Sequence, residues 1–125
     1  MTLIVDGNNV MGSRPDGWWR DRAAAARRLA AAVATWADGS RAVVLVFDGH
    51  APADPVDAPG IEVRFAARSG RDAADDVIAG LVAAAADPAG VEVVTSDAGL
   101  AARVRALGAA VRGAGRFRDE VEPPG

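Results

Sequence analysis

Aspartates stand at the ends of three apolar runs in this sequence. Asp6 follows Leu-Ile-Val, Asp48 follows Leu-Val-Phe, and Asp97 follows Val-Val-Thr-Ser. Short apolar runs are typical of buried strands, and the carboxyl ends of parallel strands meet at one edge of a sheet. The three carboxylates would therefore lie together, where they repel one another unless they take up protons or bind a cation. Oxygen ligands favour Mg²⁺ or Mn²⁺, and such an ion can activate water and stabilise charge that develops on a phosphodiester.

A second group of acids opens a segment with helical periodicity. On that helix Asp75 lies on the border of the buried face and Asp76 points away from it. The buried face consists of Ala74, Val77, Ile78, Leu81, Val82 and Ala85. Asp75 is therefore the expected contribution of the helix to the acidic site. Asp72, one turn earlier, could reach the same place. The alternative for Asp72 is structural, because Ser69-x-x-Asp72 resembles a capping box, and the two interpretations carry equal weight.

Five further residues could contact a substrate. Asn8 could orient the substrate or a metal-bound water, although Gly-Asn-Asn is also an obvious turn sequence. Trp18 could stack on a base, with a place in the core as the favoured alternative. His50 could contact the substrate or act on a proton, with a solvated loop histidine as the favoured alternative. Arg71 and Arg103 could pair with phosphates through their planar guanidinium groups.

The amino-acid composition excludes several kinds of functional site. The 125 residues include no cysteine, which excludes disulfides, thiolate metal sites and thiol nucleophiles, and no lysine, which excludes a P-loop. The net charge of −3 argues against a nucleic-acid partner, because phosphate binding depends on concentrated positive charge. The segment Ala98–Arg118 is locally basic in spite of the negative net charge. It could hold phosphates, or it could be a solvated helix face. It contains no acid and holds Arg103, Arg105, Arg112, Arg116 and Arg118.

The elements that must position these residues can be placed from the pattern of apolar residues and breakers. Strands are expected at Leu3–Val5, Ala42–Phe47, Ile61–Phe65, Val91–Thr95 and Ala109–Val111, and helices at Trp18–Ala37, Arg71–Ala86 and Ala98–Leu107. Strands that alternate with helices predict a three-layer α/β/α sandwich with a mainly parallel central sheet. We expect one domain over residues 1–118 and a disordered acidic, proline-rich tail over residues 119–125. Without a signal-like or membrane-spanning apolar stretch, a cytoplasmic protein is expected.

Four motifs together resemble a known family. They are Asp6-Gly7-Asn8-Asn9-Val10, Val46-Phe47-Asp48-Gly49, Asp72-Ala73-Ala74-Asp75 and Val94-Thr95-Ser96-Asp97, and their order and spacing resemble the NYN domains, especially the YacP-like branch of the PIN-like ribonucleases. The resemblance implies a PIN-like fold and RNA cleavage, expected to be endonucleolytic, that depends on Mg²⁺ or Mn²⁺. It also implies an RNA substrate that a ribosome or a protein partner could present. The matching residues are Asp6, Asp48, Asp75, Asp97 and Asn8 for catalysis, with Asp6, Asp75, Asp97 and Asp72 around the metal.

Three other functions remain open at this point. A phosphatase could also carry an Asp after its first strand, but Asn8 stands where that motif has a second Asp, and lysine is absent. A non-catalytic RNA-binding or partner-binding module could use the same fold without hydrolysis. A doubly wound domain could bind a small ligand at its switch point, although no glycine-rich phosphate loop supports a nucleotide there. The complete acidic set favours the nuclease.

Overall fold

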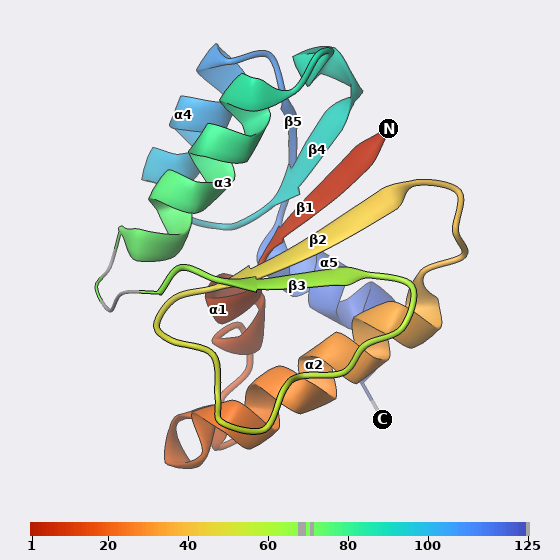
Figure 1. Cartoon of the computed structure of the whole chain (residues 1–125), viewed down its shortest axis with the longest axis vertical. Helices are drawn as coiled ribbons and strands as arrows, with labels where there is room; N and C mark the ends of the chain where they lie inside the picture. The colour runs from red at the N-terminus through yellow and green to blue at the C-terminus, as the bar shows by residue number, and fades with distance from the viewer. Residues whose placement is uncertain (68–69, 71, 125) are drawn as a thin grey trace.

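A five-stranded parallel sheet forms the centre of the molecule (Figure 1). The computed structural model describes residues 1–67, 70 and 72–124. The strands follow the spatial order β3-β2-β1-β4-β5, and every neighbouring pair is parallel. Their bounds are Thr2–Asp6 for β1, Ala42–Phe47 for β2, Glu62–Phe65 for β3, Val91–Val94 for β4 and Ala110–Arg112 for β5. The predicted strands and their parallel arrangement are confirmed, with β1 at the centre between β2 and β4.

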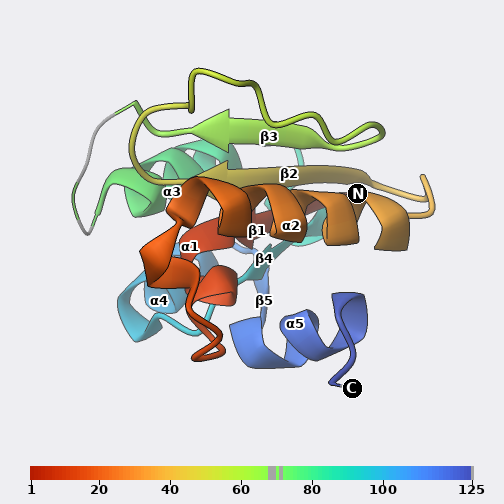
Figure 2. The same cartoon turned by 90° about the horizontal axis from the view of Figure 1, so that it is seen from below.

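Helices cover both faces of this sheet. Figure 1 shows α3 and α4 on one side and α1, α2 and α5 on the other, and Figure 2 shows the second group from below. The bounds are Gly7–Met11 for α1, Arg22–Trp36 for α2, Ala73–Ala84 for α3, Ala98–Ala106 for α4 and Ala114–Val121 for α5, with 3₁₀ turns at Trp18–Arg20 and Pro88–Gly90. The predicted three-layer α/β/α sandwich is therefore confirmed.

Two apolar clusters, one on each face of the sheet, hold these layers together. Leu3 and Val5 of β1 pack into the cluster under α1, α2 and α5, whereas Ile4 packs into the cluster under α3 and α4. Successive side chains of a strand point to opposite faces. A strand covered on both sides must therefore be apolar at every position, which explains the continuous apolar runs in the sequence.

The helices differ from the prediction mainly at α1, α2 and α5. Helix α2 begins at Arg22 rather than Trp18, because the side chain of Asp21 accepts a hydrogen bond from the backbone N–H of Ala24 and caps the helix. Helices α1 and α5 were not predicted, since Gly-Asn-Asn is a poor helix former and the end of the chain is strongly polar. The stretch from Asp119 to Val121, expected in a disordered tail, belongs to α5. No helix among the described residues is long and apolar enough to cross a membrane.

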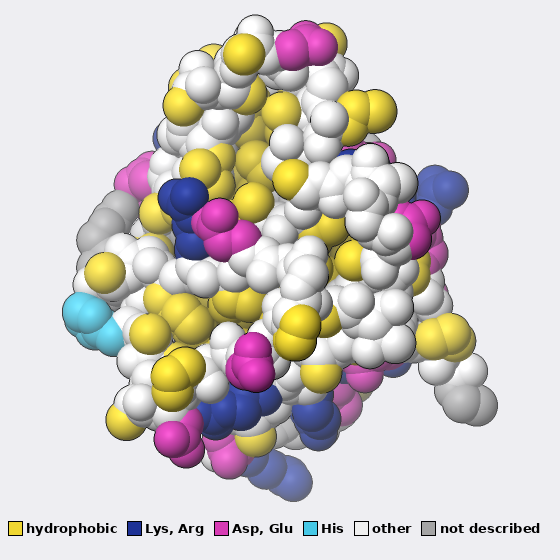
Figure 3. Space-filling model, turned by 45° about the vertical axis from the view of Figure 1, so that its right-hand side comes forward, with side chains coloured by type: hydrophobic (Ala, Val, Ile, Leu, Met, Phe, Trp, Pro, Cys, Tyr) yellow, Lys and Arg dark blue, Asp and Glu magenta, His cyan; other side chains and the backbone are white. Residues whose placement is uncertain are grey.

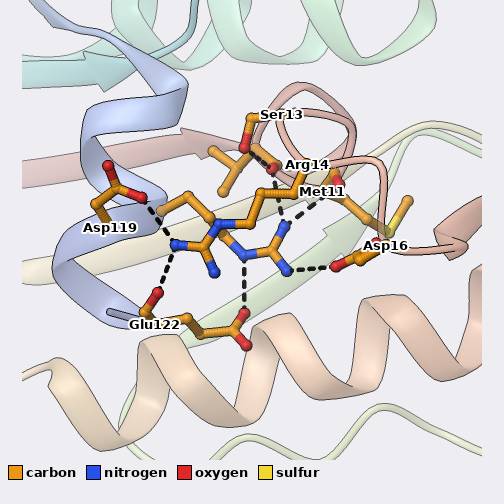
Figure 4. A network of polar contacts seen from close by, with 8 residues as sticks. Met11, Ser13, Arg14, Asp16, Asp119 and Glu122 are labelled. Carbon is orange, nitrogen blue, oxygen red and sulfur yellow. Dashed lines mark hydrogen bonds and ion pairs between the residues drawn. The ribbon is translucent and has the colours of Figure 1, made fainter. Parts of the chain in front are cut away.

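A network of ion pairs explains why α5 is ordered (Figure 4). The guanidinium of Arg118, whose side chain is 7 % exposed, pairs with Asp16 at 2.9 Å and with Glu122 at 3.0 Å. It also donates hydrogen bonds to two backbone carbonyls at the end of α1. A second arginine, Arg14, pairs with Asp119 at 2.8 Å. Because the Arg118–Asp16 and Arg14–Asp119 pairs join residues about a hundred positions apart in the chain, they attach α5 to the segment that follows α1.

Candidate functional site

The three strand-end aspartates and one helix aspartate line a single pocket at the carboxyl edge of the sheet. This acidic pocket has a volume of about 180 Å³, and its walls include Asp6 from β1, Asp48 after β2, Asp75 from α3 and Asp97 after β4. Its remaining walls are Asn8, Asn9 and Ala74. The strand order places β2 and β4 beside β1, so the predicted convergence of these four carboxylates is what the structure shows.

Asp6 is the deepest of the four acids. It is only 5 % exposed, and its Oδ2 accepts a hydrogen bond from the hydroxyl of Thr95 at 2.9 Å. Burial raises the pKa of Asp6 from its ordinary value of 3.8 to about 6; the charges of Asp75 and Asp97 also raise it, while hydrogen bonds from Thr95 and from the backbone N–H of Asn9 lower it. A buried carboxyl group with such a raised pKa is typical of a functional site.

Asp75 lies on the first turn of α3 and is partly exposed in the pocket wall. Partial burial raises its pKa, and the negative charges of Asp97 and Asp72 add to the effect. Asp76, the next residue, is exposed and pairs with Arg103 at 3.1 Å, which confirms that it points away from the pocket. The helical periodicity of the sequence therefore distinguished these two neighbouring acids correctly.

Asp72 takes the N-cap position of α3 but makes no capping hydrogen bond with its side chain. It is exposed and does not line the acidic pocket, although its charge contributes to the raised pKa of Asp75. Ser69, the other half of the predicted capping box, and Arg71, a predicted phosphate contact, lie outside the described residues. Asp72 is therefore a residue at the margin of the site.

Asp97 has two structural contacts in addition to its place in the pocket. Its Oδ1 accepts a hydrogen bond from the backbone N–H of Leu100 at 3.0 Å, which caps α4, and its own N–H donates to the hydroxyl of Thr95 at 3.1 Å. Thr95 therefore bridges Asp6 and Asp97. The neighbouring hydroxyl of Ser96 accepts from the backbone N–H of Ala114 and so holds the start of α5.

The cap leads to a stability prediction. Replacing Asp97 by Ala should lower the free energy of unfolding by about 1 kcal/mol relative to replacement by Asn, because Asn caps a helix nearly as well as Asp and Ala does not. Both variants remove the same charge from the pocket, so comparing them with each other cancels the relief of repulsion. Urea unfolding in EDTA measures the difference; equal stability of the two variants would show that the cap contributes little.

Two adjacent asparagines connect the first strand to both of its neighbours. Oδ1 of Asn8 accepts a hydrogen bond from the backbone N–H of Asp48 at 2.7 Å, and Oδ1 of Asn9 accepts from the backbone N–H of Ser96 at 2.6 Å. Helix α1 can lie this close to β2 because residue 7 is glycine: a Cβ there would stand 2.6 Å from the ring of Phe47. Asn9, which the sequence analysis missed, thus has the same role toward β4 that Asn8 has toward β2.

The donor set of the pocket suits a hard divalent cation. It offers carboxylate and amide oxygens and no sulfur, and a cation would relieve the repulsion that raises the pKa of Asp6 and Asp75. Within the described part of the chain, no three acidic or histidine side chains lie close enough together to hold an ion as they stand. Binding would therefore require side-chain rotation or bridging waters, which Mg²⁺ commonly retains.

The other predicted substrate contacts are not gathered around the acids. Trp18 is partly buried against the core cluster of α1 and α2, and Arg103 lies over α3 in its ion pair with Asp76. His50 is exposed at the rim of a second cavity that adjoins the acidic pocket.

The predicted arginine-rich surface is largely used for internal ion pairs. Arg103, Arg112 and Arg118 each pair with carboxylates, and Arg118 is buried. On the face in Figure 3, basic side chains lie beside acidic ones rather than forming a continuous basic surface. Three of the five arginines between residues 98 and 118 therefore pair with carboxylates, which favours the alternative of a solvated, ion-paired surface over a single phosphate-binding patch.

Comparisons with known proteins agree with the fold and the motifs. A search of curated protein sequences finds no match. Among solved structures, Rae1 (YacP) from Bacillus subtilis is 25 % identical and superposes with a TM-score of 0.77 over 98 % of this chain and 74 % of Rae1. A point variant of the same protein is 28 % identical, with a TM-score of 0.74 over 97 % of this chain and 74 % of the variant. The model of the YacP-like NYN domain matches residues 3–123. The chain therefore belongs to the YacP-like NYN family and has its PIN-like, nuclease-type fold.

Proposed function

We propose that this protein is a divalent-metal-dependent ribonuclease that hydrolyses RNA phosphodiester bonds within the strand. The observation that carries the proposal is the convergence of Asp6, Asp48, Asp75 and Asp97 on one pocket, with Asp6 buried and its pKa raised. Clustered, partly desolvated carboxylates destabilise a fold unless a cation compensates them. Because the chain belongs to the YacP-like NYN family, RNA is the substrate that we propose.

In this proposal Asp6, Asp75 and Asp97 hold Mg²⁺ or Mn²⁺, Asp48 contributes through water, and Asp72 adds negative charge at the margin. A bound cation of this kind supplies an activated water and neutralises charge on the phosphodiester. Asp6 is already oriented by Thr95, which limits the reorganisation that binding requires. Asn8 and Asn9 act as positioning residues, because they fix the backbone at Asp48 and Ser96 on the two sides of Asp6.

Cleavage of labelled RNA tests this function. Purified protein is incubated with linear and circular single-stranded RNA and with a structured RNA, in Mg²⁺ or Mn²⁺ and in EDTA. We expect metal-dependent cleavage that includes opening of the circle, which only an endonuclease can do. The rate of cleavage should fall at least about 100-fold in the Asp75→Asn and Asp97→Asn variants. Mutating a residue that only hydrogen-bonds to a metal ligand already lowers metal affinity or activity about 10–100-fold.

A matched control lies next to Asp75 on the same helix. Asp76→Asn removes the same charge one residue away, but from a side chain that is exposed and does not line the acidic pocket. This variant should cleave RNA like the wild type. If folded wild-type protein leaves all three RNAs intact in both metals, the ribonuclease proposal fails and the non-catalytic RNA-binding or partner-binding module becomes the better explanation.

A further inference from the structure

A second cavity opens directly beside the acidic pocket, on the side of the sheet covered by α1 and α2. This side cavity has a volume of about 310 Å³, and Asn8 and Asp48 line both it and the acidic pocket. Its size falls at the lower end of the range for small-molecule sites. A polymer whose backbone is bound at the acids would therefore have this cavity directly beside it.

Two aromatic side chains line the side cavity. The rings of Phe47 and Phe65 stack with their centroids 5.4 Å apart and their planes 24° from parallel, and both line the cavity. Phe47 is almost fully buried and is held against Gly7, whereas Phe65 at the end of β3 is partly exposed. Flat, partly exposed aromatic rings are the usual platforms on which nucleobases stack, independently of base identity.

Positive charge stands at the wall of the same cavity. Arg22, the first residue of α2, lines it, and the guanidinium carbon lies 5.3 Å from the centre of the Trp18 ring. Within the described residues no ion pair joins Arg22 to a carboxylate, in contrast to Arg103, Arg112 and Arg118. Its charge therefore remains available for a phosphate oxygen or the acceptor edge of a base.

The rim of the cavity is held in place by backbone hydrogen bonds. The N–H of Ala66 donates to the carbonyl of Phe47, and the N–H of Ala67 donates to the carbonyl of Gly49, both at 2.9 Å. Ala67 has a φ of 64°, a conformation that costs energy for a residue with a Cβ. The second hydrogen bond offsets that cost and joins the loops after β2 and β3, so a ligand finds the wall already formed.

We infer that the side cavity binds the nucleobase of a nucleotide adjacent to the cleaved phosphodiester. The inference rests on RNA being the substrate of the acidic pocket. The partly exposed ring of Phe65, backed by Phe47, suits the face of a base, Arg22 suits its phosphate or acceptor edge, and the Asp48 carboxylate can accept from an exocyclic amino group. The shared residues Asn8 and Asp48 keep this base next to the acids, so the cavity would set the register of cleavage.

A binding experiment without metal separates this inference from catalysis. Fluorescence anisotropy measures the affinity of a short labelled RNA in EDTA and at low salt, followed by a series of the same RNA with a single abasic ribose at each position. One abasic position should weaken binding by about 10-fold, the size expected for a lost base–aromatic stack. Phe65→Leu should weaken the binding of the intact RNA by a similar factor. In this variant, an abasic ribose at the same position should cause no further loss of affinity.

A second variant and a control keep the test independent of folding. Arg22→Gln should also weaken RNA binding, whereas Arg20→Gln, which removes a similar arginine that contacts the ring of Trp19 and does not line the cavity, should not. Circular dichroism establishes that each variant is folded. Insensitivity of the wild type to every abasic position would overturn the inference, as would additive effects of Phe65→Leu and the abasic ribose. If the protein cleaves RNA but gives one of these two results, only the base-binding inference is wrong. If Phe65→Leu removes the sensitivity to the abasic ribose but the protein does not cleave RNA, the base site stands and the ribonuclease proposal is wrong.

Discussion

Replacing Asp6 by Asn is expected to abolish RNA cleavage and, in the metal-free protein, to raise the free energy of unfolding. Asp6 is almost fully buried among carboxylates, which raises its pKa to about 6, so the folded protein at pH values above 6 contains a charge that its surroundings disfavour. Asn has nearly the same shape without the charge. A residue that destabilises the fold in order to hold a cation should show these two opposite effects.

The expected gain in stability depends on pH in a defined direction. A carboxyl group with a higher pKa in the folded than in the unfolded protein binds its proton more tightly in the folded form. Its stabilisation is complete below 3.8 and is lost as the pH rises through about 6, which corresponds to about 3 kcal/mol above that range. Asn replaces the hydrogen bonds from Thr95 and Asn9 imperfectly, which costs about 1–2 kcal/mol at either pH. We therefore expect a net gain of about 1–2 kcal/mol near pH 8 and a net loss of similar size near pH 4, where Asp6 carries little charge in the folded protein.

Urea unfolding in EDTA at both pH values measures the effect, and the cleavage assay on the same preparations measures the loss of activity. Asp76→Asn, which removes an exposed charge beside the pocket, should give no comparable pH-dependent gain. Mg²⁺ or Mn²⁺ should then stabilise the wild type more than Asp6→Asn, since the ligand has been removed. If the Asp6→Asn variant is less stable than the wild type near pH 8 without metal, the charge of Asp6 does not destabilise the folded protein and this prediction is wrong.

Replacing Arg118 by Met is expected to destabilise the fold by about 2–3 kcal/mol. The change leaves the carboxylates of Asp16 and Glu122 without their buried partner and removes two hydrogen bonds to carbonyls at the end of α1. Removing one member of a fully buried pair costs about 3–5 kcal/mol. The side chains of Asp16 and Glu122 are about a third exposed, at 33 % and 30 %, so water recovers part of that loss.

A second arginine of the same network is the control. Arg14→Met breaks a pair with Asp119, whose side chain is 60 % exposed, and one hydrogen bond to the carbonyl of Glu122, and should cost about 1 kcal/mol. Urea unfolding followed by circular dichroism compares the two variants. If Arg118→Met is as stable as Arg14→Met, the buried network does not hold α5 to the segment after α1, and the order of α5 must have another cause.

The sequence by itself determined the sheet and its acids. A strand buried on both faces is largely apolar, so its position can be read from the residues alone to within one or two residues, and the aspartates that end three of the runs mark the carboxyl edge of the sheet. Helical periodicity likewise distinguished Asp75 from Asp76, because only one of them borders the buried face of α3. These inferences need only the local repeat of each element and the rule that parallel strands end at one edge.

Only the tertiary structure decided which partner each polar side chain finds. Nothing near Asn8 and Asn9 in the chain indicates that one reaches β2 and the other β4, since their partners are 40 and 87 residues away. The same applies to Thr95 beside Asp6 and to the arginines that bind carboxylates instead of remaining free for phosphate. A polar side chain can satisfy its hydrogen bonds with many partners, and the packing of distant elements selects one. The residues near a polar side chain in the sequence therefore do not indicate its partner. Buried apolar residues, by contrast, recur with the period of their strand or helix and can be recognised in the sequence.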